Sequence, residues 1–221
     1  MTAQPLRIDF VSDIACPWCV IGLRGLLQAL EATGAQAEIH FQPFELNPNI
    51  APEGENTAEH VAKKYGSTRE RSDAARQMIK EHGAALGFNF NYGPESRIWN
   101  TFDAHRLLHW AGHEGPDKQL ALKQAFFKLT FTDQRPSNDR AALLDAVREV
   151  GLDSARAGQI LDSDEFAADV RALEQQWMRN GIRAVPAVIF NQKWLVQGGQ
   201  PPAVFENAIR NILNGTAAEA R

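Results

Sequence analysis

The stretch LRIDFVSDIACPWC, at residues 6–19, decides the fold. Its first half, residues 6–11, is mostly apolar with β-branched and aromatic side chains, which predicts a short strand. A turn follows, and Pro17 suits the first position of a helix, where its missing N–H breaks no hydrogen bond. The stretch therefore places Cys16 and Cys19 at the beginning of a helix that closely follows a strand.

The next residues complete a strand–helix–strand unit. Leucines at helical spacing continue the helix to Gly34, a residue type that is common at helix ends. Residues 37–44 alternate in part, with Ile39 and Phe41 on one face, and predict a second strand. The order strand, helix, strand is that of a βαβ unit.

A block of helices separates this unit from the remaining strand-like residues. Residues 47–56 are rich in Pro, Gly and Asn and predict a loop. Beyond this loop, the periodicity predicts helices at residues 57–65, 68–86, 97–110, 117–131, 138–150 and 164–180. Ser163 or Asp164 is a suitable N-cap for the last of these helices.

Strand character returns only near the end of the chain, at residues 187–190 and 194–196, followed by a predicted helix at 202–213. An isolated hairpin is only marginally stable, so we expect strands from both ends of the chain to form one sheet. The predicted fold class is α/β with a helical insertion. Its discontinuous sheet domain and its insertion are expected at residues 1–52 with 178–221, and at 53–177.

Composition and charge exclude several classes of protein. The 221 residues are 44% hydrophobic and 23% charged, which are ordinary values for a globular protein. The net charge of −4 argues against nucleic acid or an anionic membrane as partner, and no apolar stretch reaches the length of a membrane span. The first residues lack the pattern of a secretory signal, so we expect a cytoplasmic protein.

The chain has two cysteines, and their spacing points to redox chemistry. Cysteines three positions apart at a helix start lie on one face, close enough to form a disulfide. At the cap position, unpaired backbone N–H groups and the helix dipole stabilise a thiolate, which is the nucleophilic form of a thiol. We therefore expect Cys16 to attack substrates and the deeper Cys19 to resolve the mixed disulfide.

A zinc site is the alternative interpretation of this cysteine pair. Structural zinc needs four ligands, whereas the chain has no further cysteine and no histidine at a partner spacing beside the pair. We therefore expect a redox-active disulfide with no metal and no bound cofactor. Trp18, between Pro17 and Cys19, would either pack beside the disulfide or cover it.

A second segment, GIRAVPA at residues 181–187, leads into the third predicted strand. Pro186 cannot donate a hydrogen bond to a sheet, so its missing N–H must face away from the strand pairing. The peptide bond between Val185 and Pro186 can be cis or trans, and composition alone leaves both open.

Four segments together resemble the DsbA-like thioredoxin family, and within it the FrnE-type oxidoreductases, which are related to 2-hydroxychromene-2-carboxylate isomerases. These segments are SDIACPWCVIG (12–22), PFELNPN (43–49), NTFDAHRL (100–107) and GIRAVPAVIFNQKWLVQGGQP (181–201). The resemblance implies a thioredoxin-like fold interrupted by a helical insertion domain. It also implies a cis-proline opposite the cysteine pair, which corresponds here to Pro186 preceded by Val185.

The function implied by this resemblance is thiol–disulfide exchange with protein or small-molecule thiol substrates. An external thiol such as glutathione or thioredoxin would serve as reductant. Two alternatives are a glutathione-dependent isomerase of the 2-hydroxychromene-2-carboxylate type and a non-catalytic, chaperone-like binding module. The isomerase branch has a serine where Cys16 stands, which argues against isomerase activity. Some relatives carry a second cysteine pair; this chain has none, which rules out an internal thiol relay.

The segment NTFDAHRL contributes three further candidates, Asn100, His105 and Arg106. These side chains would either line a cleft above the cysteine pair or form hydrogen bonds between helices. Asp13, three residues before Cys16, would either relay protons to the deeper cysteine or cap the turn.

Histidines recur every four residues along one predicted helix. His105, His109 and His113 stand at i, i+4 and i+8 on one face. The spacing suits a ladder of metal ligands, but a mixed surface face with a histidine at a pocket rim is the commoner arrangement.

Overall fold

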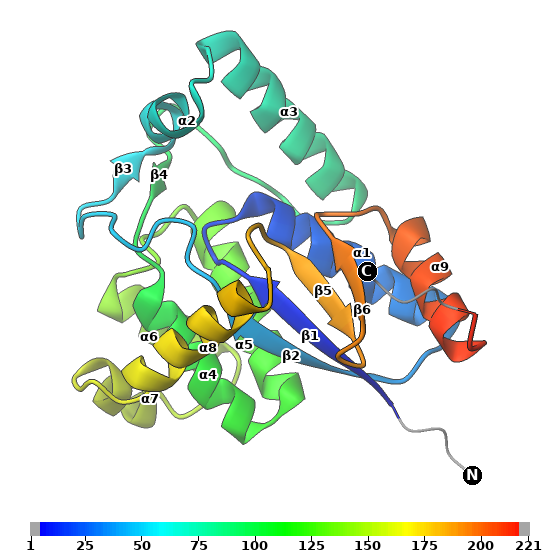
Figure 1. Ribbon diagram of the computed structural model, residues 1–221. Helices are drawn as coiled ribbons and strands as arrows, with labels where there is room; N and C mark the ends of the chain where they lie inside the picture. Colours follow the sequence, from blue (N-terminus) through cyan, green and yellow to red (C-terminus); the bar gives the residue numbers. More distant parts are fainter. Residues whose placement is uncertain (1–4, 217–221) are drawn as a thin grey trace.

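One four-stranded sheet joins the two ends of the chain. The computed structural model describes residues 5–216. The strands lie in the order β2-β1-β5-β6 and comprise β1 (Leu6–Ser12), β2 (Ala37–Pro43), β5 (Ala187–Phe190) and β6 (Trp194–Gln197). β1 pairs parallel with β2 and antiparallel with β5, so the expected sheet from both ends of the chain is confirmed (Figure 1).

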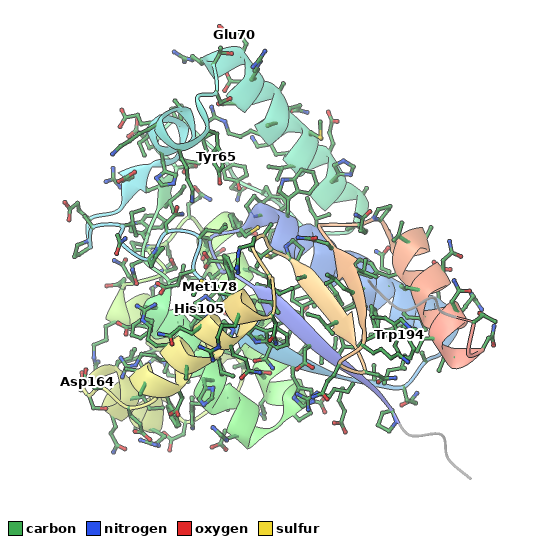
Figure 2. All side chains as sticks on the ribbon, in the orientation of Figure 1. Tyr65, Glu70, His105, Asp164, Met178 and Trp194 are labelled. Atoms are coloured by element: carbon green, nitrogen blue, oxygen red, sulfur yellow. The ribbon has the colours of Figure 1, made fainter. Side chains whose placement is uncertain are left out.

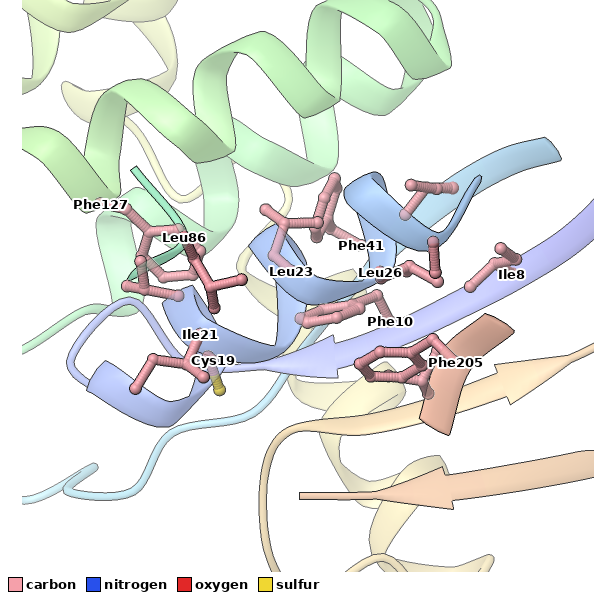
Figure 3. Packing of buried hydrophobic residues seen from close by; sticks show 14 of the residues in the cluster. Ile8, Phe10, Cys19, Ile21, Leu23, Leu26, Phe41, Leu86, Phe127 and Phe205 are labelled. Atoms are coloured by element: carbon pink, nitrogen blue, oxygen red, sulfur yellow. The ribbon is translucent and has the colours of Figure 1, made fainter. Parts of the chain in front are cut away.

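The central strand β1 is buried on both faces, and its alternating side chains enter two different cores. Ile8 and Phe10 point toward α1 (Pro17–Thr33) and α9 (Pro202–Leu213), where Phe205 and Leu26 also pack (Figure 3). Val11 faces the other way, toward Trp177. Complete burial of a side chain such as Phe10 contributes about 1.5–3 kcal/mol to the stability of the fold.

Helices α1 and α9 pack against each other over the sheet, and Gly25 makes their close approach possible. A Cβ atom at Gly25 would lie 2.8 Å from the carbonyl oxygen of Gln200 and 3.5 Å from the ring of Phe205. A side chain at this position would therefore push the start of α9 away from α1. Helix α1 ends as expected before Gly34, its C-cap residue, which adopts the left-handed conformation with φ 65°.

Helices fill the chain between β2 and β5. They are α2 (Thr57–Tyr65), α3 (Arg69–Ala85), α4 (Phe102–Glu114), α5 (Pro116–Phe131), α6 (Arg140–Glu149), α7 (Ser154–Leu161) and α8 (Ala167–Arg179). Helices α4, α5 and α8 pack against β2, and α4 to α7 share a second hydrophobic core. The helical insertion is therefore observed, while its exact limits at residues 53 and 177 stay a prediction.

Two helix starts differ from the sequence prediction. The helix expected from residue 97 begins at Phe102, because the Asn100 side chain accepts a hydrogen bond from the Phe102 N–H (2.9 Å). The preceding residues form β4 (Arg97–Ile98), which pairs with β3 (Glu55–Asn56). The helix expected from residue 164 begins at Ala167 after Phe166, and neither proposed cap residue caps it.

Helix α7 is absent from the sequence prediction, although it carries a strong start signal. The Asp153 side chain accepts hydrogen bonds from the N–H groups of Ala155 (2.8 Å) and Arg156 (3.1 Å). The helix has only eight residues, so its apolar periodicity is too short to stand out. Within residues 5–216, none of the helices is both long and apolar enough to cross a membrane.

Candidate active site

The cysteine pair occupies the first turn of α1, as its sequence predicts. Cys16 is the N-cap residue in an extended conformation, and Pro17 follows as the first helical residue. The Cys19 N–H donates to the Cys16 carbonyl oxygen at 3.1 Å, and the two cysteines are not linked by a disulfide in this structure. Cys16 retains 4% exposure and Cys19 none, so only Cys16 reaches the surface.

Two loops from the C-terminal part of the chain enclose this turn. The Cys16 thiol donates to the carbonyl oxygen of Val185 at 3.7 Å, and the Val185–Pro186 bond is cis. A Cβ atom at Gly22 would lie 3.0 Å from the Pro186 ring, and one at Gly199 would lie 2.8 Å from the Trp18 carbonyl oxygen. Both glycines therefore allow α1 and these loops to touch.

Asp13 lies buried beneath the cysteine turn and holds several segments together. Its Oδ1 accepts from the Thr101 hydroxyl (2.8 Å) and the Ala15 N–H (3.2 Å), and its Oδ2 accepts from the Leu46 N–H (2.7 Å). Burial raises the pKa of this carboxyl, but its contacts with His105, Leu46 and Thr101 outweigh burial and lower the pKa below its ordinary value. Asp13 is therefore a carboxylate at neutral pH, and it also caps the turn.

Burial raises the pKa of the Cys19 thiol well above its ordinary value, and the neighbouring Cys16 raises it further. The positive charge of Lys123 acts in the opposite direction. Cys19 is therefore protonated at neutral pH, and its proton must be removed before its sulfur can act as a nucleophile. Figure 3 shows Cys19 at one end of the core cluster, where its sulfur lies beneath α1.

Lys123 is the functional candidate that the sequence analysis missed. It lies on α5 with no exposure, and its Nζ has no hydrogen-bond partner among residues 5–216. The ammonium lies 4.8 Å from the ring centre of Phe127 and 5.7 Å from that of Phe41. Burial lowers its pKa to about 8, against the opposing effects of Cys19, Asp13 and Cys16. Lys123 precedes Phe127 by four residues and therefore lies on the apolar face of the predicted helix, and this position could have indicated its burial.

Of the three candidates in the segment at residues 100–107, the structure brings His105 to the cysteine turn. His105 is buried in the interior (Figure 2), and its Nε2 lies 3.4 Å from Asp13 Oδ1. Asn100 holds the start of α4 and donates to the Pro48 carbonyl oxygen at 3.3 Å. The Arg106 guanidinium donates to carbonyl oxygens at the end of α7 and in the segment between α7 and α8, including that of Glu165 at 2.9 Å. Arg106 therefore connects helices.

A second charged cluster, in which the two carboxyls are buried and the guanidinium is partly exposed, lies near His105. Arg171 forms ion pairs with Glu45 and with Glu174, the latter at 2.8 Å. Burial raises the pKa of both carboxyls, although Arg171 opposes this effect. This cluster brings the loop after β2 and the helix α8 together.

Aromatic side chains surround the approach to Cys16. Trp18 contacts His82 of α3, with ring centres 5.8 Å apart. Burial raises the pKa of Tyr65 and of Tyr92, and the nearby Cys16 adds to this effect at both residues. Tyr65 lies at the end of α2 that faces α1 (Figure 2). Helices α2 and α3 therefore stand over the cysteine turn.

Tyr92 also lines a cavity of about 580 Å³ between α2, α3 and residues 92–94. Arg69, Asp73, Arg76 and Lys80 contribute charged groups to its wall. Across the described range 5–216, no group of three or more His, Cys, Asp or Glu side chains is arranged to hold a metal ion.

Comparison with known proteins agrees with this geometry. Residues 7–210 match the DSBA-like thioredoxin domain. A probable DsbA oxidoreductase from Streptomyces coelicolor superposes with a TM-score of 0.87 and 30% identity, covering 98% of this chain and 93% of that one. A 2-hydroxychromene-2-carboxylate isomerase reaches a TM-score of 0.72 at 11% identity, covering 95% of this chain and 97% of that one.

The cytosolic disulfide reductase DsbM from Pseudomonas aeruginosa, with GSH, has the same fold. It superposes with a TM-score of 0.63 at 15% identity, covering 94% of this chain and 99% of that one. These two structures, at 11% and 15% identity, agree with the thioredoxin-like fold and its helical insertion. From the family match over residues 7–210 and the shared architecture, the chain belongs to the DsbA-like thioredoxin family.

Proposed function

We propose that the chain is a thiol–disulfide oxidoreductase that uses Cys16 as nucleophile and Cys19 as resolving thiol. The observation that carries this proposal is the unequal burial of two adjacent thiols at the start of α1. The slightly accessible Cys16 sits where unpaired backbone N–H groups and the helix dipole stabilise a thiolate. Cys19 has no exposed surface, so attack by a substrate is expected at Cys16.

The exchange proceeds in two steps that conserve electrons and protons. The Cys16 thiolate attacks one sulfur of a substrate disulfide, a new S–S bond forms, and the first substrate thiolate leaves. Cys19 then loses its proton and attacks the Cys16 sulfur, which releases the second substrate thiolate. The products are a Cys16–Cys19 disulfide and a reduced substrate, and two electrons have passed to the substrate. The same steps in reverse oxidise a dithiol.

The main chain at Val185 is suited to align a substrate. Its carbonyl oxygen already accepts from the Cys16 thiol, which places this backbone beside the reacting sulfur. An extended peptide could pair with such a backbone segment, as in β-strand addition. We infer protein disulfides or small-molecule disulfides as substrates, and an external thiol such as glutathione or thioredoxin as the regenerating reductant. No bound cofactor is required by these steps.

A cytoplasmic location fits the cysteine content. Two cysteines three positions apart in one helical turn suit catalysis, whereas disulfide-stabilised extracellular proteins use several widely spaced pairs. The isomerase alternative rests on a shared fold at 11% identity, and the thiol of Cys16 argues against it. Thiol–disulfide exchange is therefore favoured over isomerisation as the activity of this chain.

Reduction of insulin disulfides with dithiothreitol as electron donor tests this function. The wild-type protein is expected to accelerate insulin reduction, and Cys16→Ala is expected to abolish the acceleration. Cys19→Ser is expected to accumulate substrates as mixed disulfides on Cys16, visible on non-reducing gels. Equal rates for the wild type and Cys16→Ala would reject the proposal.

A further inference from the structure

Three histidines form a row along α4 from the buried site to the surface. His105 is 2% exposed and its Nε2 lies 3.4 Å from Asp13 Oδ1. His109 is half-buried, and His113 is exposed. The Nε2 atoms of His109 and His113 lie 3.3 Å apart, within hydrogen-bond distance. The row therefore spans the whole depth between Asp13 and solvent.

A small cavity connects the inner two histidines. His105 and His109 line it together with Lys123, and its volume is about 10 Å³. This volume is close to the minimum of roughly 10–15 Å³ that holds one water molecule. The Nε2 of His105 and the Nζ of Lys123 are buried and without hydrogen-bond partners among residues 5–216. Both polar atoms could be bridged by a single water in this cavity.

The chemistry of the site requires a route for one proton. When Cys19 attacks the mixed disulfide, its S–H proton must leave while the electron pair departs with the substrate thiolate. Lys123 acts on Cys19 through its positive charge, and its pKa of about 8 keeps it an ammonium at neutral pH, so it cannot accept this proton. The Asp13 carboxylate, whose charge acts on Lys123, is the buried acceptor. A proton left on Asp13 would change the charge of the interior, where an unbalanced charge is costly.

We infer that His105, His109 and His113 form a relay that carries the proton of Cys19 from Asp13 to solvent. This inference rests on the proposed function, because the relay serves the resolving step. The proton passes from Asp13 to His105, through the cavity to His109, and from His109 to His113. Each imidazole accepts a proton on one nitrogen and donates another, so the relay returns to its starting state.

The surroundings of His109 suit transfer in both directions. Burial and the neighbouring His113 lower the pKa of His109, whereas Asp169 of α8 raises it. Lys123 of α5 faces it across the cavity, and Phe166 covers both outer rings, with ring centres 5.2 Å from His109 and 5.6 Å from His113. His109 is therefore neutral at pH 7, so it can accept a proton and pass it on.

The charged cluster of Glu45, Arg171 and Glu174 is the competing exit. The charge of His105 acts on Glu45 of this cluster, and Arg171 reaches the surface with 43% of its side chain exposed. A proton could leave by this cluster only if one of its carboxyls changed its charge during the step. Glu174→Gln distinguishes this route from the row of histidines.

A single-turnover reaction with the coloured aryl disulfide dithiobis(nitrobenzoate) measures the resolving step. Attack by Cys16 releases the first nitrothiobenzoate, and attack by Cys19 releases the second. This leaving group remains a thiolate at neutral pH, so the proton of Cys19 must reach solvent through the protein. The variants are His109→Gln and His113→Gln, and the control is His40→Gln on β2, which is partly exposed beside Glu38.

The relay predicts that His109→Gln slows the second phase by at least about 10-fold, since proton transfer by a positioned group typically contributes 10²–10⁴-fold. The first phase is expected to stay unchanged, and added imidazole is expected to restore part of the lost rate. His113→Gln is expected to slow the second phase less, and His40→Gln not at all. The solvent deuterium isotope effect on the second phase is expected to increase in His109→Gln.

Two results would overturn the relay while leaving the proposed function intact. One is an unchanged second phase in His109→Gln. The other is a slowing in Glu174→Gln that exceeds the slowing in His109→Gln. In contrast, a first phase that persists in Cys16→Ala, or a wild type without a second phase, would reject the proposed function itself.

Discussion

The sulfur of Cys16 lies 3.7 Å from the carbonyl oxygen of Val185, although the two residues are 169 positions apart in the chain. The turn that carries Cys16 and the loop at Val185 and Pro186 thus form two sides of one site, and each comes from a different end of the sequence. The contacts between this turn and this loop determine how accessible Cys16 is.

Limiting iodoacetamide is expected to alkylate Cys16 before Cys19 in the reduced protein. Cys16 is 4% exposed whereas Cys19 is fully buried, and burial raises the pKa of the Cys19 thiol, which leaves little thiolate there. Peptide mapping by mass spectrometry after short labelling measures the ratio. Preferential labelling of Cys19 would reverse the assigned roles, and Cys16→Ala should show only slow labelling.

Gly199→Ala is expected to lower both stability and insulin reduction. The added Cβ would lie 2.8 Å from the Trp18 carbonyl oxygen, so the loop or the cysteine turn must shift. Such overpacking typically costs about 1–3 kcal/mol. Gly93→Ala is the matched control, because no atom lies within 4 Å of its added Cβ. Urea unfolding and insulin reduction together check the result; equal behaviour of the two variants would contradict the contact.

Lys123→Met is expected to raise the free energy of unfolding at neutral pH. Burial lowers the pKa of Lys123 from 10.5 to about 8 in the folded protein, so the charged form is disfavoured there. This difference corresponds to a penalty of about 3 kcal/mol below pH 8, with each pKa unit worth about 1.4 kcal/mol. Methionine fills a similar volume without charge, and a gain of about 1–3 kcal/mol follows.

The gain should depend on pH in a defined direction. Between pH 8 and 10.5 the unfolded wild type binds more protons than the folded protein, so wild-type stability rises with pH in this window. The advantage of Lys123→Met should therefore shrink as pH rises through it. Urea unfolding of the reduced proteins at both ends of the window measures this, with the exposed Lys128→Met as control. A gain that does not vary with pH would contradict the burial of a charged amine.

Asp13→Asn is expected to destabilise the protein and to slow the second phase of the aryl disulfide reaction. The carboxylate accepts three hydrogen bonds, and loss of a buried acceptor costs about 1–3 kcal/mol. The folded pKa of Asp13 lies below its ordinary value of 3.8, so its contribution is present above pH 3.8 and is lost as pH falls through the folded pKa. The exposed Asp117→Asn is the control.

The measurement for Asp13→Asn is urea unfolding at neutral pH and at pH values below 3.8. The difference between wild type and variant should be largest at neutral pH and should decrease in acid. A difference that stays constant into acid would mean that the charge of Asp13 does not contribute to stability.

Local signals allowed the sheet, most helices and the cysteine turn to be predicted from the sequence. Pro17 and Gly34 define the ends of α1 within a few residues, because helix starts and stops depend on nearby backbone groups. The burial of Lys123 depends instead on how α5 packs against β2. The residues next to Lys123 in the sequence do not indicate this tertiary packing. For the same reason Arg106 and His105, neighbours in sequence, proved to serve different parts of the molecule.

The two helix starts that were wrong have different causes. The Asn100 side chain accepts from the Phe102 N–H, and Phe166 adopts a left-handed conformation with φ 63° just before Ala167, so each helix begins later than its apolar periodicity. The Arg97 guanidinium binds the carbonyl oxygens of Glu53 and Gly54, which keeps this residue in a strand pair. Side-chain contacts of this kind are set by the tertiary fold.

The pairing of β1 with β5 has a consequence for biosynthesis. Cys16 and Cys19 are synthesised long before Val185 and Pro186, because β5 follows all of α2 to α8 in the sequence. An incomplete polypeptide therefore carries a reactive thiol pair without the loop that contacts it. Closure of this long-range pairing is slow compared with helix formation. Premature termination anywhere in the helical block would yield a product that has both cysteines but lacks the loop at Val185 and Pro186 that contacts them.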